Sequence, residues 1–521
     1  MTYEDLISVE PQGSASRRDA ARVRAESEGT ANSALDWALE CFAGYQFREG
    51  HAALAVATER EPGFLALKWL GFQYPLDPSP RDEAQQADFV QRWRNGLRWF
   101  ESQDFRRPEV RQQLWGCIQS ATPFYLHYVL DAVPEMRRYG RLLSKMMAVL
   151  DSGVATQPIR RNRRRIAIVS AHLREHTVSR LFLPMFERLD LQRFELHYLA
   201  LEPVSVERQE RLRRSGLLHL GPKEGLQWRQ TLASIGPDII VYPEIGMHAM
   251  HQGLAALRLA PVQMAMWGHP VTSGLSTIDY AVVPDALEPA DAAAHYHEQL
   301  LRLPGLGHGL VSPTHPTRNL DLPGVRRAEP DTIEILCAQS VFKLLPAQDA
   351  LFAKILRALP KARLHLTPLV SGEPLTELRV RMGRALALAG VDVAERVVTH
   401  APMSLADFVA LAGSCDFGID TIGWSGGMSA LDQLPTGLPI VALEGLTMRS
   451  RQTAALLRWL DVPEVIARDT DDLVTIALRL GTDPDLRTRL RRLILERAPT
   501  LYAQDATQEA FANFLGSVQP P

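Results

Sequence analysis

Residues 418–445 read GIDTIGWSGGMSALDQLPTGLPIVALEG, the pattern of a strand, a glycine turn, a short helix and a second strand. The first strand ends in Asp420 and Thr421, and the helix is broken by Pro435 and Gly437. Glycines between a strand and a helix let backbone N–H groups approach a phosphate, while the helix dipole favours the negative charge. Without a GxGxxG or GxxxxGK[ST] motif, the stretch alone predicts either a diphosphate site or a simple tight turn.

The same alternation of strand and helix extends outward from this stretch in two series. The first series runs through RIAIVSAH (165–172), VSRLFLPMFERL (178–189), FELHYLAL (194–201) and PDIIVYPE (237–244). The second runs through TIEILCAQS (332–340), AQDALFAKILRAL (347–359), ARLHLTPLV (362–370), RVVTHAP (396–402) and LADFVALAGS (405–414). Apolar strands that alternate with helices indicate parallel sheets. We therefore predict an α/β protein with two Rossmann-like domains, 159–330 and 331–521, that face each other across a cleft.

The remaining N-terminal part, 1–158, is predicted to be an all-helical domain that binds an acceptor or partner. Its apolar residues recur at helical spacing from 32 to 150, with almost no β-branched alternation. A basic connector, DSGVATQPIRRNRRR (151–165), follows. We interpret it as a solvated linker, because no aromatic residues lie between its arginines as a nucleic-acid site would require.

Length and charge narrow the class of protein. The chain has 521 residues, too many for one core and enough for two or three domains at roughly 150 residues each. Its composition is that of a globular protein, with 46% hydrophobic and 22% charged residues. The formal net charge of −3 gives no general attraction to nucleic acid or to an anionic membrane. An anionic ligand must therefore be bound by local features.

Cysteines and targeting signals predict a cytoplasmic protein. The four cysteines, Cys41, Cys117, Cys337 and Cys415, show no zinc-ligand spacing and are expected to be reduced core residues. The N-terminus is polar and acidic where a secretory signal would be basic and then apolar. No run approaches the roughly 20 apolar residues that span a bilayer.

Lys343 strengthens the phosphate interpretation of the glycine turn. It lies in SVFKLLPAQ, directly after the first strand of the same predicted domain, where a side chain can reach the cleft. An ammonium group beside a helix N-terminus can neutralise a diphosphate without a metal. The alternative is a solvated loop lysine, which is the commoner role of a single lysine.

Beyond these patterns, the chain resembles a known family over about residues 165–500. The stretch from CDFGIDTIGWSGG to RWLDVPEVIA (415–467), together with LGTDPDLRTRLRRLI (480–494), resembles the C-terminal catalytic region of the O-linked N-acetylglucosamine transferases. Residues 236–283, which contain QMAMWGHPVTSGLSTIDY, look still more like the bacterial N-glycosyltransferases that modify high-molecular-weight adhesins. This resemblance implies the GT-B architecture. The short helical part in place of a long superhelix of tetratricopeptide repeats is closer to the adhesin-modifying branch.

The resemblance implies site residues position by position. The diphosphate-contacting lysine corresponds to Lys343, and the ribose-binding aspartate corresponds to Asp432. The histidine of the adhesin-modifying branch in GHP corresponds to His269, which is thereby implied to line the acceptor side of the active site. A histidine of the O-linked enzymes corresponds to His176 in REHTVSR, the second acceptor-side candidate. The phosphate-binding turn corresponds to Gly426, Gly427, Met428 and Ser429.

Two features depart from a simple transfer of the family's properties. Where the O-linked enzymes carry a lysine and a histidine near the nucleoside, this chain has Leu405 and Phe408; Phe408 is expected to stack on the base, whose identity is then less secure. RDTDD (468–472) resembles the Asp-x-Asp metal site of other glycosyltransferases, but it precedes a helix that Thr470 or Asp471 would cap. We therefore predict no catalytic metal and no cofactor.

The function that the resemblance implies is an inverting protein glycosyltransferase. The donor would be a UDP-sugar such as UDP-glucose or UDP-GlcNAc, and the acceptor Asn or Ser/Thr of an adhesin, flagellin or other surface protein. Lys343 and the amides of Gly427 to Ser429 would stabilise the leaving diphosphate, and His269 would orient the nucleophile or help remove its proton. Two alternatives stay open: an isomerase like the sugar-nucleotide 2-epimerases, which share the fold, and a non-catalytic partner protein.

Overall fold

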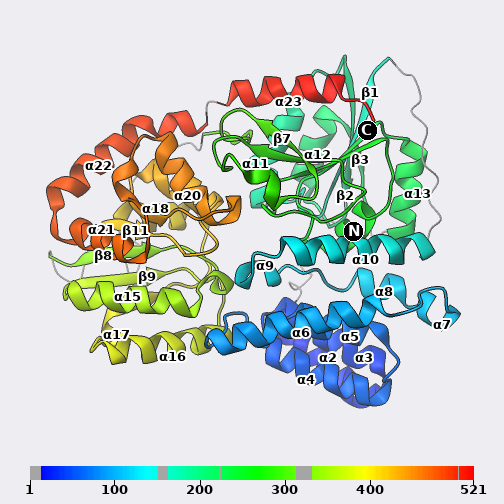
Figure 1. Ribbon diagram of the computed structural model, residues 1–521, viewed down its shortest axis with the longest axis horizontal. Coiled ribbons are helices and arrows are strands. Elements are labelled where there is room, and N and C mark those ends of the chain that lie inside the picture. The colour runs from blue at the N-terminus through cyan, green and yellow to red at the C-terminus, as the bar shows by residue number, and fades with distance from the viewer. Residues whose placement is uncertain (1–12, 151–161, 222–224, 313–330, 503, 521) are drawn as a thin grey trace.

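The computed structural model describes residues 13–150, 162–221, 225–312, 331–502 and 504–520. Two α/β domains lie side by side, and a helical domain packs against the first of them (Figure 1). Most of the basic connector predicted at 151–165, and the domain boundary expected after residue 158, lie outside the described residues.

The N-terminal domain is helical throughout its described part, as the apolar spacing predicts. Ser14, Thr30 and Asp82 each accept a hydrogen bond from a first-turn N–H and so begin three of the helices. Trp69 and Trp93 are fully buried in its core. The helices are α2 (Ala15–Glu28), α3 (Ala31–Ala43), α4 (Phe47–Arg60), α5 (Leu65–Gln73), α6 (Glu83–Glu101), α7 (Pro108–Arg111), α8 (Leu114–Ile118), α9 (Leu126–Val129) and α10 (Val133–Leu150).

The first α/β domain contains a parallel sheet in the order β3-β2-β1-β4-β5-β6-β7. The order of its first six strands is that of a Rossmann fold, whose ligands bind where the order reverses, beside β1 and β4. The strands are β1 (Arg164–Ser170), β2 (Phe194–Ala200), β3 (Leu217–His219), β4 (Ile239–Tyr242), β5 (Val262–Met266), β6 (Tyr280–Pro284) and β7 (Gln299–Leu303). The helices are α11 (Thr177–Glu187), α12 (Val206–Ser215), α13 (Gly225–Ile235) and α14 (Ala249–Ala255).

The second α/β domain repeats this topology, in the order β10-β9-β8-β11-β12-β13. The reversal lies between β8 and β11, the strands that precede Lys343 and the glycine turn. The strands are β8 (Ile333–Cys337), β9 (Ala362–Leu366), β10 (Val397–Thr399), β11 (Phe417–Ile419), β12 (Ile440–Leu443) and β13 (Ile466–Ala467). The helices are α15 (Pro346–Ala358), α16 (Glu373–Leu388), α17 (Val393–Arg396), α18 (Leu405–Ser414), α19 (Met428–Gln433), α20 (Met448–Trp459), α21 (Thr470–Thr482) and α22 (Pro484–Arg497).

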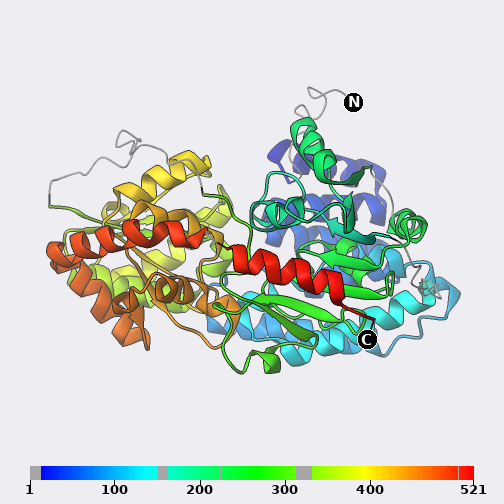
Figure 2. The ribbon, with the colours of Figure 1, turned by 90° about the horizontal axis from the view of Figure 1, so that it is seen from above.

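The last helix, α23 (Asp505–Ser517), falls within the range predicted for the second domain but packs on the first (Figure 2). Arg164 of β1 donates hydrogen bonds to the carbonyl oxygens of Leu515 (3.0 Å) and Val518 (2.7 Å). Gln508 Nε2 donates to the carbonyl oxygen of Met185 on α11 (3.0 Å). The C-terminal segment therefore ties the two α/β domains together.

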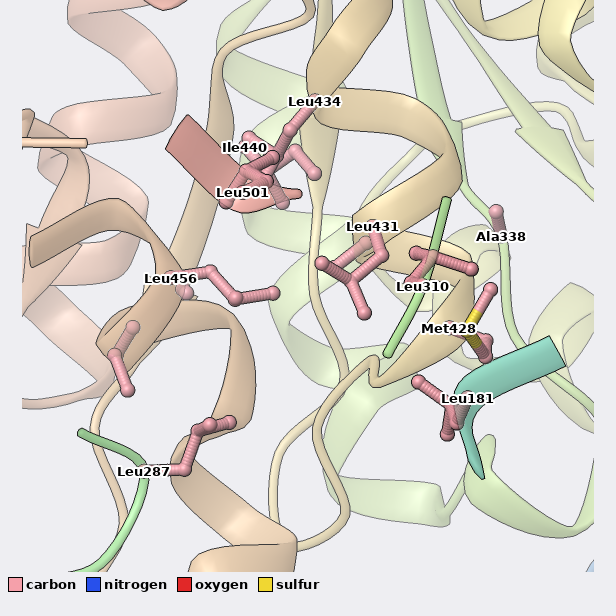
Figure 3. Packing of buried hydrophobic residues seen from close by; sticks show 14 of the residues in the cluster. Leu181, Leu287, Leu310, Ala338, Met428, Leu431, Leu434, Ile440, Leu456 and Leu501 are labelled. Atoms are coloured by element: carbon pink, nitrogen blue, oxygen red, sulfur yellow. The ribbon is translucent and has the colours of Figure 1, made fainter. Parts of the chain in front are cut away.

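Apolar packing continues from one α/β domain into the other. Leu181 of α11 and Leu310, both of the first domain, lie beside Met428 at the start of α19 (Figure 3). This contact holds the glycine turn against the first domain, so the two walls of the cleft are joined at one end by a buried core.

Two expectations about the chain as a whole can be compared with the structure. All four cysteines are buried and free, as expected of reduced core residues. Among the described helices, none combines the length and the apolar character that crossing a bilayer requires.

Candidate active site

A cavity of about 510 Å³ lies between the carboxyl ends of the two sheets. Its lining residues follow β1, β4 and β5 of the first sheet and β8 to β12 of the second, and the N-terminal domain adds two more. This volume is in the range of ligand sites, which is roughly 300–1,000 Å³. The predicted residues that line it are His269, Lys343, Phe408, Gly427, Met428, Ser429 and Asp432.

Lys343 ends the short 3₁₀ helix η2 (Val341–Lys343) that follows β8. Its Nζ donates hydrogen bonds to Gln339 Oε1 (2.9 Å) and to the carbonyl oxygen of Ser425 (3.2 Å). Burial lowers the pKa of Lys343 to about 8, although the nearby Asp420 carboxylate acts in the opposite direction. The ammonium is thus held directly beside the glycine turn. The negative charge of a diphosphate would compensate for the solvation that the ammonium loses on burial.

Asp420, fully buried at the end of β11, organises the glycine turn. Its carboxylate accepts hydrogen bonds from Ser425 Oγ (2.6 Å), the Gly426 N–H (2.9 Å) and Gln339 Nε2 (3.0 Å). Burial raises the pKa of Asp420. Because the Gly426 N–H is bonded inside the domain, the amides that remain to meet a phosphate begin at Gly427.

The two glycines leave room for two glutamine side chains. Neither Gly426 nor Gly427 has a positive φ. A Cβ on Gly426 would lie 2.7 Å from Gln339 Nε2, and one on Gly427 would lie 2.5 Å from Gln452 Oε1. Gln339 and Gln452 also line the cavity, and sequence reasoning missed both. Only the structure shows that these two side chains lie close to the glycines, so the sequence could not identify them.

Helix α19 begins at Met428, so the N–H groups of Met428 and Ser429 come before the first hydrogen bonds of the helix, which Ala430 and Leu431 donate to the carbonyl oxygen of Gly427. Gly427, Met428 and Ser429 line the cavity at this end of the helix. Backbone donors and the positive end of the helix dipole therefore face the same space as Lys343.

Asp432 already has a partner in the structure. Arg180 of α11 donates through both terminal nitrogens to its carboxylate, at 2.6 and 3.0 Å. The pair joins the two domains across the cleft, and both residues line the cavity. A ribose bound at Asp432 would have to share or replace this bidentate contact. The sequence alone did not predict the pairing of Arg180 with Asp432.

His269 lies just after β5, in contact with two aromatic rings. Phe124 (5.3 Å between ring centroids, 23° between planes) and Trp424 (5.4 Å, 29°) both stack with its imidazole. The side chain is 3% exposed, and its Nε2 is buried without a hydrogen-bond partner. Burial, with Arg449 nearby, lowers the pKa of His269 to about 3, so the imidazole is neutral at physiological pH.

His176 has a different position from the one expected of a cavity residue. Its Nδ1 accepts the N–H of Val178 (3.2 Å), which makes it the N-cap of α11. Its ring stacks on His172 (3.9 Å), and burial together with Arg174 lowers its pKa to about 4. The neighbouring Thr177 and Arg180 line the cavity, but His176 is not among its lining residues.

Phe408 and Leu405, on α18, line an apolar end of the cavity together with Leu369 and Met403. Leu405 is 45% exposed and Leu369 55% exposed, although both are large apolar side chains. This end suits the flat face of a base, and the stacking role of Phe408 stays a prediction.

The acidic stretch 468–472 caps a helix, as expected, but with a different residue. Asp469, and not Thr470 or Asp471, is the N-cap of α21 and accepts the N–H of Asp472 (2.8 Å). Thr470 is already the first helical residue. Asp472 is bonded to the backbone and side chain of Arg468. These residues do not line the cavity, and no group of three or more potential metal ligands occurs within the described residues.

Comparison with known proteins relates the second α/β domain to a family of glycosyl transferases. Residues 326–506 match the family described as Glycosyl transferase family 41. A UDP-glucose:protein N-beta-glucosyltransferase of Actinobacillus pleuropneumoniae is 28% identical over 270 residues, 51% of this chain and 42% of that protein. A probable UDP-N-acetylglucosamine–peptide N-acetylglucosaminyltransferase SPINDLY of Eustoma exaltatum is 26% identical over 254 residues, 47% of this chain and 26% of that protein. The chain thus spans less than half the length of these curated relatives.

Among solved structures, a mutant O-GlcNAc transferase of Thermobaculum terrenum has a TM-score of 0.72 and 25% identity, with 99% of this chain and 97% of that one covered. The similarity includes the helical N-terminal part as well as both α/β domains. The predicted resemblance to both branches, and the GT-B fold, are confirmed. The second α/β domain thus lies in the part of the chain that matches the Glycosyl transferase family 41 model, and the fold is of the GT-B type.

Proposed function

We propose that this chain transfers a hexose or N-acetylhexosamine from a UDP-sugar to Asn or Ser/Thr of an acceptor protein. The relatives' names give two donors, UDP-glucose and UDP-N-acetylglucosamine, each with a protein or peptide acceptor. Whether the acceptor is an adhesin, a flagellin or another surface protein stays part of the proposal, as does a cytoplasmic location.

The observation that carries the proposal is the arrangement of one wall of the cavity. Lys343 Nζ lies 3.2 Å from the carbonyl oxygen of Ser425, beside the amides that begin at Gly427. Asp432 is one helical turn beyond those amides, on the same helix. The wall thus offers a cation and amides for the two phosphates and, one turn further along the helix, a carboxylate for the ribose of a nucleoside diphosphate.

In the proposed reaction the acceptor nitrogen or oxygen forms a bond to the anomeric carbon on the face opposite the UDP. The bond from that carbon to the β-phosphate oxygen breaks, UDP leaves with the electron pair, and the acceptor proton is released to solvent. Positive charge gathers on the sugar and negative charge on the diphosphate in the transition state. Lys343 and the α19 amides stabilise the second of these charges.

His269 acts on the acceptor side in this proposal. Because its pKa is about 3, it is a weak base at physiological pH. Its role is therefore to accept a hydrogen bond from the nucleophile and orient it, rather than to form a long-lived imidazolium. We propose that inversion proceeds without a metal or other cofactor, since the leaving charge already has a cation and a helix N-terminus to meet it.

The test combines transfer with binding. A candidate acceptor protein is incubated with the chain and UDP-glucose or UDP-N-acetylglucosamine, and its intact mass is measured. The expected gain is one or more hexose or N-acetylhexosamine units. Lys343→Met should abolish the gain, whereas Lys354→Ala, which removes an exposed lysine of the same domain, should not change it.

Two other results would replace the proposal. A changed sugar in UDP-sugar incubated with the protein but without an acceptor would indicate an isomerase. No detectable UDP binding in calorimetry would indicate a non-catalytic protein that keeps the fold.

A further inference from the structure

The cavity has a wall that belongs to neither α/β domain. Phe124 and Tyr128, from the segment around α9 of the N-terminal domain, are among its lining residues. Both rings pack against residues of the active site rather than against the core of their own domain alone. The segment therefore reaches the site from outside the GT-B unit.

The rings of this segment form a continuous series of contacts with the site. Phe124 and Trp424 each stack with His269, at 5.3 and 5.4 Å. Tyr128 meets Phe124 edge-on at 5.2 Å, stacks on Trp424 (4.3 Å, 28°) and contacts Phe342, the neighbour of Lys343, at 4.6 Å. Three domains thus contribute rings to one arrangement, which includes the imidazole.

Hydrogen bonds fix the segment to both α/β domains. Thr122 Oγ1 donates to the carbonyl oxygen of Gly246 in the first domain (2.7 Å). Arg449 of the second domain donates to the carbonyl oxygen of His127, and its guanidinium lies over the Trp424 ring at 5.7 Å. The ends of the segment are therefore held independently, and Phe124 has little freedom to leave the imidazole.

Two further contacts confine the imidazole. A Cβ on Gly246 would lie only 2.9 Å from His269 Cδ2, so that glycine leaves room for the ring. The His127 ring meets His269 edge-on at 5.3 Å. Together with Phe124 and Trp424, these contacts fix the plane of the ring and leave it on the cavity wall, a function that a carboxylate partner performs in many catalytic sites.

We infer that Phe124 and Tyr128 are positioning residues of the transfer reaction, and that the N-terminal domain completes the active site by fixing His269 and forming one wall of the acceptor side. The inference rests on the proposed function for the reaction concerned. It predicts that the orientation of the acceptor, and not the binding of UDP, depends on these two rings.

The first test replaces the ring of Phe124 with an aliphatic chain. Phe124→Leu should lower kcat at least about 10-fold, since misplacement by about 1 Å can cost 100-fold, while the Kd for UDP changes less than twofold. Phe124→Tyr keeps a ring and should retain most of kcat. Phe105→Leu makes the same change at a residue buried in the N-terminal core and should leave kcat within twofold. Phe124→Leu with near wild-type kcat, or with UDP binding lost in parallel, would overturn the inference.

A second readout does not need catalysis. His269 in the wild-type protein should resist modification by diethyl pyrocarbonate, measured by peptide mass spectrometry, and Phe124→Leu should expose it. The groups around the ring, His127, Arg449 and Tyr128, are unchanged in this variant. Equal protection of His269 in both proteins would contradict the inference even if transfer is never observed. Absence of transfer with altered protection would instead remove only the proposed function.

The pH profile distinguishes positioning from mere stability. Because burial is the main cause of the low pKa of His269, admitting water beside it should raise that pKa towards 6.5. The activity of Phe124→Leu should then fall between pH 7 and 5, where the wild-type enzyme stays level. A loss of stability alone, as in Phe105→Leu, would not produce this fall in activity between pH 7 and 5.

Discussion

The two walls of the cavity are built in opposite ways. On the donor side, Gln339 joins Lys343 to Asp420, accepting a hydrogen bond from Lys343 Nζ and donating one to the Asp420 carboxylate. On the acceptor side, His269 is held by rings and keeps a buried nitrogen without a partner. The first wall is organised to stabilise charge and the second to fix a neutral group. Changes on the two sides should therefore affect different measured quantities.

Removing the charge of the donor wall should have the largest effect. Lys343→Met keeps much of the volume but leaves Gln339 Oε1 and the Ser425 carbonyl without their donor. Turnover should fall by about 100-fold or more, the cost of removing one preorganised donor to a developing negative charge. Steady-state transfer assays with circular dichroism as a fold control would measure it. Turnover close to wild type would remove Lys343 from the diphosphate site.

The matching change on the acceptor wall should separate turnover from binding. His269→Ala should reduce kcat by about 100-fold, within the range for groups that handle the nucleophile's proton, while UDP affinity, set in the other domain, stays nearly constant. Calorimetry of UDP binding with the same preparation provides the comparison. A matched loss of both quantities would place His269 in the donor site.

The sequence predicted the donor wall better than the acceptor wall, for a physical reason. Lys343 and the glycine turn each follow a strongly apolar strand, and parallel strands bring such positions together at one edge. Phe124 and Tyr128 carry no comparable signal, because an aromatic residue at helical spacing fits an ordinary core equally well. Their role depends on contacts between domains, which no local pattern specifies.

The same limit applies to the pairing of Arg180 with Asp432, which are 252 positions apart, because it depends on how the domains meet. His176 differs for a local reason: it precedes α11 and caps that helix, a role not predicted for it from the sequence. Strands and helices were predicted well because their periodicity is local.

Asp432 links the two walls, so its replacement should affect binding moderately. Asp432→Asn should weaken UDP binding by about 1 to 3 kcal/mol, the range for hydrogen bonds to a charged group. The variant also releases Arg180, so Arg180→Met is the control: it keeps the carboxylate and should change the Kd for UDP less than about threefold. Unchanged affinity in Asp432→Asn would make this residue a domain-joining one only.

The pH dependence should report the donor wall alone. Protonated Lys343 is the active form, and burial lowers its pKa to about 8. The kcat/KM value should thus stay level between pH 5 and 7 and fall about tenfold per unit above pH 8. Bound diphosphate favours the charged lysine, so the fall in kcat should begin at higher pH. A Lys343→Arg variant with residual activity should not show the fall in kcat/KM above pH 8. An unchanged fall in this variant would assign the titration to another group.

Removal of metal ions should have the smallest effect of all. In the proposed reaction the leaving diphosphate would face Lys343 and the first turn of α19, which line the cavity and would meet the charge that a metal could otherwise neutralise. The Asp-x-Asp-like stretch has its carboxylates engaged elsewhere: Asp469 caps α21, Asp471 pairs with Lys354, and Asp472 pairs with Arg468. Transfer measured in EDTA should therefore equal transfer in its absence within error, and added Mn²⁺ should not increase it. Activity that is lost in EDTA and restored by Mn²⁺ would show that the donor wall is incomplete without a cation, and would overturn the account of Lys343 as its main charge.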